Sequence, residues 1–170
     1  AKPQPEVGHF WMKVHQKDRG QTPKVKVSYV VTPCMHCENA PCEKASDGAI
    51  YHREDGLVII DPEKSKGKEN LVDACPYGSI YWNEELNIPQ KCTGCAHLLD
   101  DGWEVPRCVE ACAHDALLFG EGEDFADLLE NAEVLKPELN TKPRVFYNNL
   151  PKRFLAGQVV DTEADEVLIG

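Results

Sequence analysis

Cysteine is the residue type in this sequence with the most chemical potential, because a thiolate is a metal ligand, a nucleophile and one half of a disulfide. The 170-residue chain has eight cysteines. Two pairs are separated by two residues, a spacing that lets one turn of backbone aim both sulfurs at one metal centre. One further cysteine directly precedes a proline. The eight residues are Cys34, Cys37, Cys42, Cys75, Cys92, Cys95, Cys108 and Cys112.

The position of Cys75 indicates which metal centre this spacing favours. Cys75 stands directly before Pro76 and far from either C-x2-C pair. In ferredoxin-type sites, three close cysteines bind one [4Fe–4S] cluster, and the cysteine before the proline ligates the other cluster. The sequence therefore predicts one complete [4Fe–4S] cluster with four ligands. These are Cys34, Cys37, Cys42 and Cys75.

The last four cysteines allow two interpretations. Counted alone, they could form one site with four cysteine ligands, of a kind that also holds structural zinc. Yet Cys112 follows Cys108 by the gap between the third and fourth ligands of a ferredoxin motif. By cross-ligation, Cys92, Cys95 and Cys108 should hold a second cluster whose fourth ligand lies upstream of this chain. Cys112 should then ligate a third cluster, shared with that upstream segment, so we expect three clusters in the intact subunit.

Disulfides and zinc are the competing interpretations of the cysteines. An even cysteine count is typical of disulfide frameworks in secreted domains, and a zinc-stabilised interaction module would have no redox role. The paired C-x2-C spacing favours metal over disulfides, and the cysteine before Pro76 favours iron–sulfur over zinc. His36 and His97 lie beside cluster cysteines, where they could tune a potential or simply pack. No Ser/His/Asp set, phosphate loop or carboxylate pair stands out, so we predict no catalytic residue in this chain.

An internal repeat supports the ferredoxin interpretation. Residues 48–54 return in similar form at 78–84, and a weaker copy runs over 115–121. The second and third copies each begin three residues after a cysteine. In the first copy Ala45 occupies that place, with Ser46 next to it. Repeated halves of this sort are typical of ferredoxins.

One cluster of this pattern is missing from the sequence. A C-x2-C-x2-C-x3-C-P motif ending at Cys75 would need cysteines at the positions of Ser65, Lys68 and Leu71. The fourth ligand, expected near positions 45–46, is absent as well. All four ligands of one cluster are therefore missing together. We expect the lysines at 64, 66 and 68 to form a solvated surface.

Composition excludes several classes of partner. The chain has 18 Lys and Arg against 29 Asp and Glu, a net charge of −11, which argues against nucleic acid or an anionic membrane. No apolar run approaches the length of a membrane span. The chain begins at Ala1 rather than Met, so we expect a segment upstream.

The elements around the cysteines are predicted to be short, because twelve Pro and twelve Gly are typical of a loop-rich fold. The fold class is α+β: a ferredoxin-like 4Fe–4S fold with short hairpins and helices, an extended C-terminal arm and the start of a truncated β domain. The predicted strands are 24–31, 50–52 with 57–60, and 80–82 with residues near 88. Brief helices should precede Cys75 and carry Cys108 and Cys112, with a further helix over 124–132, an arm over 137–151 and a last hairpin of 159–160 with 167–169. The predicted domains are an N-terminal segment 1–33, a 4Fe–4S domain 34–122, a helix and arm 123–157, and the β-domain start 158–170.

The order of four cysteine motifs along the chain gives it a specific resemblance to a known family. Over about residues 8–157 it resembles the iron–sulfur subunits that accompany molybdopterin enzymes of the dimethyl-sulfoxide-reductase type. Within that family, residues 8–12, 33–41, 61–68 and 136–145 resemble the small subunits of pyrogallol–phloroglucinol transhydroxylases and resorcinol hydroxylases. The motifs are CMHCENAPC (34–42), CPYG (75–78), KCTGCAH (91–97) and CVEAC (108–112).

The resemblance implies an electron-transfer subunit of a molybdopterin-dependent hydroxytransferase that acts on polyhydroxylated aromatics. It implies a heterodimer in which molybdenum, bis-pterin and substrate sit on a large catalytic subunit. It also implies an N-terminal C-x2-C-x2-C-x3-C segment and a C-terminal β domain that this chain does not include. We expect a cytoplasmic complex with no membrane partner. The alternative within the family is the electron-transfer subunit of a respiratory molybdopterin reductase, which would be periplasmic.

Overall fold

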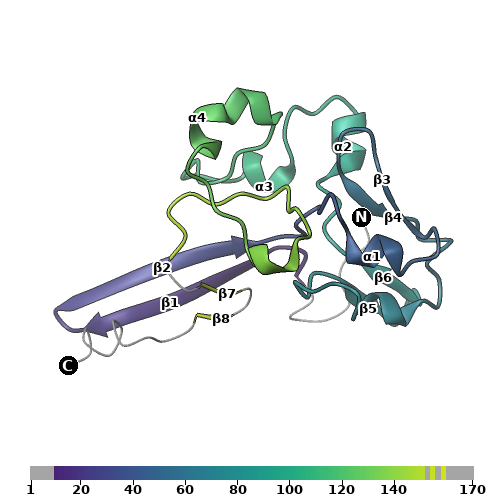
Figure 1. The fold of residues 1–170 in the computed structure, drawn as a ribbon, viewed down its shortest axis with the longest axis horizontal. Coiled ribbons are helices and arrows are strands. Elements are labelled where there is room, and N and C mark those ends of the chain that lie inside the picture. The colour runs from purple at the N-terminus through teal and green to yellow at the C-terminus, as the bar shows by residue number, and fades with distance from the viewer. Residues whose placement is uncertain (1–9, 152–153, 156–157, 160–170) are drawn as a thin grey trace.

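The computed structural model describes residues 10–151, apart from the side chain of Lys17, and the backbone of residues 154–155 and 158–159. Its elements are two-stranded sheets and helices of about one turn, as expected for a small α+β fold. Figure 1 shows these short elements grouped together, with one long hairpin that projects away from them.

The projecting hairpin consists of β1 (Lys13–Gln21) and β2 (Lys24–Thr32), paired antiparallel along their whole length. The sequence predicted β2 but not β1. The reason is that β1 is polar, without the apolar alternation that marks a strand, and adopts its conformation by pairing with β2. Gly20, the second-last residue of this polar strand, has φ +89°, and a Cβ there would collide with the carbonyl of Lys24.

Two short hairpins confirm the sequence prediction. β3 (Ile50–His52) pairs with β4 (Val58–Ile60), and β5 (Tyr81–Asn83) pairs with β6 (Ile88–Gln90). Each hairpin begins inside one copy of the internal repeat. The repeat therefore corresponds to one structural unit, in which a turn at the ligand position leads into a hairpin.

The helices are short, and several carry or flank a cysteine. Cys42 is in α1 (Pro41–Lys44), and Cys108 is in α3 (Arg107–Glu110), whereas Cys112 lies just beyond the end of α3. Cys95 is the N-cap of α2 (Ala96–Asp100). The 3-10 helix η1 (Glu69–Leu71) precedes Cys75, as predicted.

The helix predicted over 124–132 is shorter and irregular. It consists of the 3-10 helix η2 (Gly122–Phe125) followed by α4 (Ala126–Leu129). Leu128 is 45% exposed, so the apolar spacing in this segment does not indicate a face buried in the core. Without such packing a short helix has little to stabilise it.

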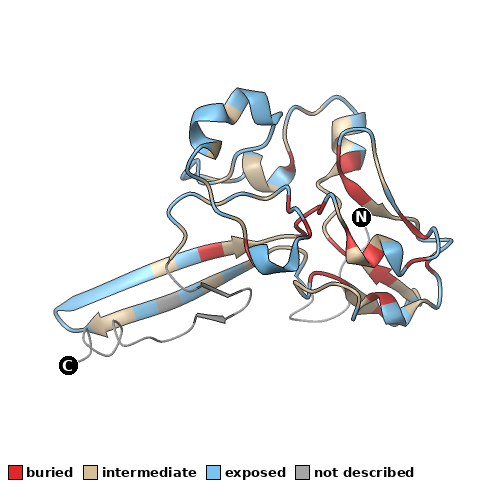
Figure 2. Ribbon diagram, in the orientation of Figure 1, coloured by how far each residue is buried: buried red, intermediate tan, exposed pale blue. Residues whose placement is uncertain are grey.

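A compact hydrophobic core lies under the first group of cysteines (Figure 2, red). Cys37 and Cys42 belong to this core, together with apolar residues from the repeat units and from β2. The core therefore closes directly around two candidate ligands. Its other members are Val30, Met35, Ala40, Ile50, Val58, Leu71, Ile80 and Leu135.

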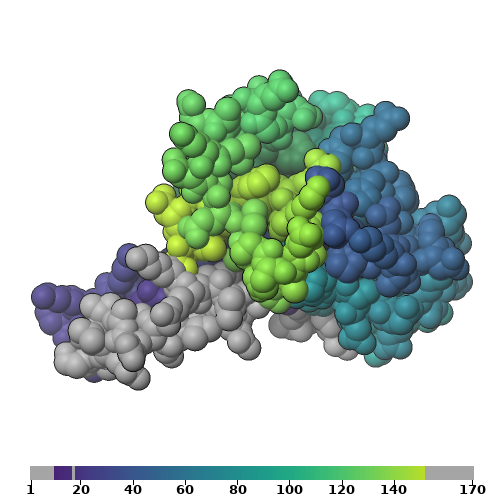
Figure 3. Space-filling model, viewed as in Figure 1, coloured from purple at the N-terminus to yellow at the C-terminus, as the bar shows by residue number. Residues whose placement is uncertain are grey.

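The predicted arm packs onto the chain's own cysteine loop. It contains the 3-10 helix η3 (Pro137–Leu139), and its backbone pairs with residues 35–39 through three hydrogen bonds of 2.9–3.0 Å. The Tyr147 hydroxyl donates to the carbonyl of Val31 at 2.9 Å. Figure 3 shows this yellow-green segment against the blue cysteine loop. The arm is therefore part of the core structure rather than a free linker.

The predicted C-terminal hairpin differs in its pairing. β7 (Phe154–Leu155) pairs with β8 (Gln158–Val159), so Val159 pairs with Phe154. The partner strand predicted for it, 167–169, lies outside the described residues, so that pairing stays a prediction. Residues 160–170 lie outside the described part of the chain. Among the described residues, no helix is long and apolar enough to cross a membrane.

Candidate iron–sulfur site

The first group of thiols comes from three separate places in the chain. Cys34 and Cys37 lie in the loop after β2, Cys42 in α1, and Cys75 after η1. The first three are each 8% exposed, and all eight cysteines of the chain are free. The charges of Cys34 and Cys75 act on Cys37 and Cys42, so the fold brings these four thiols together. The disulfide interpretation finds no support in this arrangement.

Burial dominates the electrostatics of this first group. It raises the pKa of Cys37 to about 11 and that of Cys42 to about 12, and the charges of neighbouring thiolates add to the effect. Burial also raises the pKa of Cys75, against hydrogen bonds from the backbone of Ser79 and Tyr77. Several thiolates in one buried place need a compensating positive charge. Iron supplies such a charge, so this set of donors fits an iron–sulfur cluster.

Two thiols of the second group lie on the wall of a cavity of about 310 Å³. Cys92 and Cys95 line it, together with Trp11, which comes from the segment just before β1. The indole Nε1–H of Trp11 is buried and has no hydrogen-bond partner among the described residues. Burial raises the pKa of Cys92 and of Cys108, and the charge of Cys95 further raises that of Cys108. A cavity with thiols on its wall and an unpaired donor nearby fits a bound cluster.

Cys112 has a different environment from these thiols. Backbone N–H groups of His114 and Ala116 lower its pKa, and the N–H of Ala116 lies 3.3 Å from its Sγ. Burial contributes little, unlike at Cys92 and Cys108. The direction of the pKa shift thus distinguishes Cys112 from Cys92 and Cys108, although all three are half-buried and the charge of Cys112 raises the pKa of Cys108.

A shared turn geometry identifies the lost ligand of the first repeat. The N–H of Ser79 donates to Cys75 Sγ at 3.4 Å, four residues apart, as Ala116 does to Cys112. The N–H of Ile50 donates to Ser46 Oγ at 2.9 Å with the same separation. Ser46, rather than Ala45, therefore occupies the position of the ligand. The sequence repeat pointed to Ala45 because the first copy begins two residues after its ligand position, whereas the second and third copies begin three residues after theirs.

The positions of the missing cluster are filled by protein. Ser46, Ser65 and Leu71 are completely buried, and Leu71 belongs to the hydrophobic core. The ammonium of Lys68 donates to the carbonyl of Ser46 at 2.7 Å. The prediction that Lys68 forms part of a solvated surface is therefore wrong, whereas Lys64 and Lys66 are exposed.

The peptide group of Val58 connects the two cysteine groups. Its N–H donates to His36 Nδ1 at 2.9 Å, and its carbonyl accepts from the ammonium of Lys91. Burial lowers the pKa of His36 to about 3, and the charge of Lys91 contributes. His36 is therefore neutral, with its proton on Nε2, because Nδ1 accepts a hydrogen bond. Sequence reasoning noted His36 but missed Lys91, whose place directly before Cys92 was the available signal.

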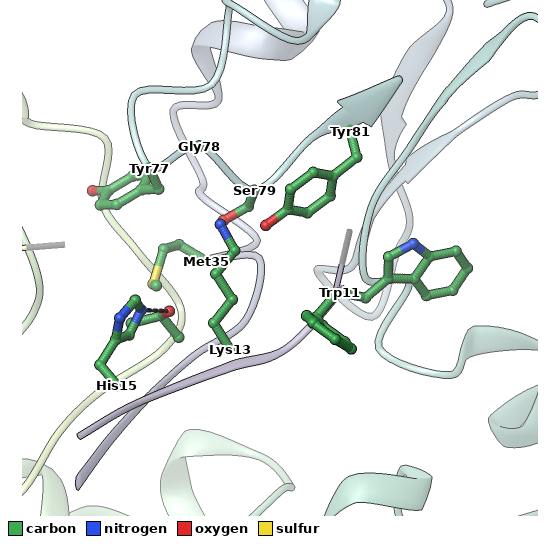
Figure 4. Close-up of a pocket in the computed structure, with 10 residues that line it drawn as sticks. Trp11, Lys13, His15, Met35, Tyr77, Gly78, Ser79 and Tyr81 are labelled. Atoms are coloured by element: carbon green, nitrogen blue, oxygen red, sulfur yellow. Dashed lines mark hydrogen bonds between the residues drawn. The ribbon is translucent and has the colours of Figure 1, made fainter. Parts of the chain in front are cut away.

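A second cavity lies beside the loop that follows Cys75 (Figure 4). Its volume is about 30 Å³, which suits a water molecule rather than an aromatic substrate. The ammonium of Lys13 lies 4.9 Å from the centre of the Tyr81 ring, and His15 forms a 2.8 Å hydrogen bond with Thr32. The first contact joins the start of β1 to β5, and the second joins β1 to the end of β2.

Among the described residues, no three His, Cys, Asp or Glu side chains are placed to hold one metal ion. A structural zinc would need four ligands around one centre. In a cubane each thiolate binds a different iron, so the sulfurs stand farther apart.

Comparison with known proteins identifies the family. Residues 25–122 match the 4Fe–4S dicluster domain family. The chain is 54% identical over 150 residues to the pyrogallol hydroxytransferase small subunit of Pelobacter acidigallici, with 84% of the chain and 55% of that protein covered. It is 36% identical over 159 residues to a subunit of the tetrathionate reductase of Salmonella typhimurium, with 87% and 63% covered.

A third relative is matched over a larger share of its own length than the first two. The chain is 30% identical over 200 aligned positions to a putative dimethyl sulfoxide reductase iron–sulfur subunit of Halobacterium salinarum, with 94% of the chain and 76% of that protein covered. The chain spans 55% and 63% of the first two relatives. These matches favour iron–sulfur over zinc, because the matched domain family binds 4Fe–4S clusters. The chain belongs to the 4Fe–4S dicluster family of iron–sulfur subunits, of the dimethyl sulfoxide reductase type.

Proposed function

We propose that this chain is the electron-transfer subunit of a molybdopterin-dependent hydroxytransferase that acts on polyhydroxylated aromatics. The observation that carries the proposal is its 54% identity to a pyrogallol hydroxytransferase small subunit, in a chain with eight free cysteines. A large subunit would carry molybdenum, bis-pterin and the aromatic substrate. In the described part of this chain, the larger cavity is lined by candidate cluster ligands, and the smaller one holds no more than water.

We assign the ligands by the cross-ligation rule of ferredoxins. Cys34, Cys37, Cys42 and Cys75 hold cluster one. Cluster two is held by three thiols, with a fourth ligand upstream of this chain, and Cys112 ligates a third cluster shared with that upstream segment. The lowered pKa of Cys112, which backbone N–H groups cause, supports this separation, since burial raises the pKa of Cys92 and Cys108. The three ligands of cluster two are Cys92, Cys95 and Cys108.

The protein's contribution to electron transfer is to hold, shield and space these centres. A [4Fe–4S] cluster, when bound, supplies a centre that accepts and releases one electron. The core around Cys37 and Cys42 excludes water from cluster one. The charge of Cys34 reaches Cys92, so the two ligand sets lie near each other, as a relay requires. The domain boundaries 1–33, 34–122, 123–157 and 158–170 are part of the same proposal.

A respiratory reductase is the second candidate, favoured by the 36% identity to a tetrathionate reductase subunit. A respiratory subunit needs an unbroken relay to a membrane anchor. In this chain the positions of one whole cluster are filled by protein, which argues for a shorter relay. The residues at these positions are Ser46, Ser65, Lys68 and Leu71.

Anaerobic isolation of the native complex tests the proposal. The preparation should be brown, bleach with dithionite, and contain iron, acid-labile sulfide and molybdenum, with a molybdopterin subunit in equal amount. It should transfer a hydroxyl group between polyhydroxylated benzenes. A colourless protein with stoichiometric zinc would contradict the iron–sulfur assignment. A quinone-reactive membrane partner would favour the respiratory candidate.

A further inference from the structure

Lys91 is a buried cation at the boundary between the two cysteine groups. It follows β6, directly precedes Cys92, and is only 3% exposed. Its ammonium donates to the carbonyl of Cys92 at 3.1 Å and to the carbonyl of Val58. None of the ion pairs among the described residues includes Lys91. Its hydrogen bonds therefore go to neutral acceptors.

A buried ammonium without a counter-charge is costly. Lysine is almost never fully buried unless paired, because removal of a charge from water is not offset by carbonyl dipoles alone. The nearby ring of His36 is neutral and cannot supply a negative charge. A negative partner for Lys91 must therefore come from another kind of group.

The hydrogen bonds of Lys91 lead to both groups of candidate cluster ligands. Its ammonium donates to the carbonyl of Cys92, which belongs to the second group. The Val58 peptide also links Lys91 to His36, which lies between Cys34 and Cys37. The ammonium is thus fixed between both ligand sets by geometry.

We infer that Lys91 is the shared counter-ion of clusters one and two, a positioning residue that raises both reduction potentials together. The inference rests on the proposed iron–sulfur function. When an electron passes between the clusters, one is oxidised and the other reduced by one electron. A cluster that gains an electron gains negative charge, so a fixed positive charge favours its reduced state. Because one charge acts on both clusters, its removal should lower both reduction potentials. The difference between the two potentials should then change less than either potential does.

The test is Lys91→Met in the complete complex, with a redox titration of each cluster followed by electron paramagnetic resonance. Methionine keeps an unbranched side chain of similar length and removes the charge. At a fixed ambient potential, the ratio of reduced to oxidised cluster should fall about tenfold for both clusters, or about 59 mV for a one-electron couple. The matched control Lys66→Met removes an exposed lysine, and its ratios should change less than about twofold, because water screens that charge.

Lys91→Arg separates charge from packing. It should keep both clusters, with ratios near those of the unmodified complex. If Lys91→Met loses iron but Lys91→Arg keeps it, the counter-ion role is supported. If both variants lose iron, or if potentials change at neither cluster or at only one of them, the inference is wrong. An unmodified complex without iron would instead contradict the proposed function, so the two failures are distinguishable.

Discussion

Single thiols in this protein take their properties from residues that are distant in sequence. Cys75 lies after η1, yet its charge acts on Cys37 and Cys42 in the first group. The N–H of Ser79 points at its sulfur, as expected for a thiolate ligand. Substitution of single cysteines therefore tests the ligand pairing directly.

Replacement of Cys75 by Ala should remove the same cluster as replacement of Cys34 by Ala. Both thiols ligate cluster one in our assignment, because the cysteine before a proline serves a remote motif. Electron paramagnetic resonance of the reduced complex and its iron content measure the loss. The signal of the cluster held by Cys92 is the internal control and should persist. An unchanged cluster-one spectrum in Cys75→Ala would show that the pairing is wrong.

At the scale of elements, the arm after α4 supports the first cysteine loop. Leu135 is 1% exposed and belongs to the same core cluster as Cys37 and Cys42. Backbone hydrogen bonds then join residues 141–144 of the arm to the loop at 35–39. The loop that holds the ligands is thus stabilised by a segment outside the ferredoxin repeat.

Leu135→Ala should reduce the free energy of unfolding by about 2–5 kcal/mol, because it leaves a cavity in a closely packed core. Denaturant unfolding under anaerobic conditions measures the change. The control Leu139→Ala truncates a leucine that is 41% exposed in the same arm, and should change stability by less than about 0.5 kcal/mol. Equal effects of the two substitutions would contradict the packing role of the arm.

In our assignment, Cys112 in the turn after α3 ligates a different cluster from Cys108 in α3. Cys112→Ala should therefore disturb the cluster whose other ligands lie upstream, and spare the one held by Cys92. Spectra of the intact subunit measure this, whereas in the 170-residue chain alone the substitution should change little. If Cys112→Ala removes the cluster that Cys92→Ala removes, the last four cysteines form one self-contained site.

At the scale of the whole molecule, the filled cluster site shortens the relay. Lys68 and Ser46 are joined by a hydrogen bond where two ligands of a fourth cluster would stand, and Leu71 fills space in the core. Under the proposed function, electrons that enter this subunit should therefore have fewer centres through which to leave it.

The complex should accordingly fractionate with its large subunit and away from membranes. Cell fractionation at low and high salt, with both subunits followed by immunoblot, measures this. Salt should not change the distribution, because electrostatic attachment to a membrane would be screened. Recovery of both subunits in a detergent-dependent fraction would contradict the prediction.

The sequence by itself determined the candidate ligands, the two short hairpins and the family. Ligand spacing and turn residues are local, and a cysteine before Pro76 carries its meaning without tertiary contacts. The polar strand β1 could not be predicted, because its conformation depends on pairing with β2. The helix expected over 124–132 is shorter because its apolar side chains do not reach the core.

Only the tertiary structure decided which residues are buried at the positions without cysteines and which lysine is buried beside the candidate ligands. Ser46 was hidden by a one-residue offset in the repeat, and hydrogen bonding in its turn identified it. Lys91 looked like one of many lysines in the sequence, until its burial and its bond to Val58 were known. Burial changes the energy of a charge by removing water, and a sequence pattern does not record which charges lose their water.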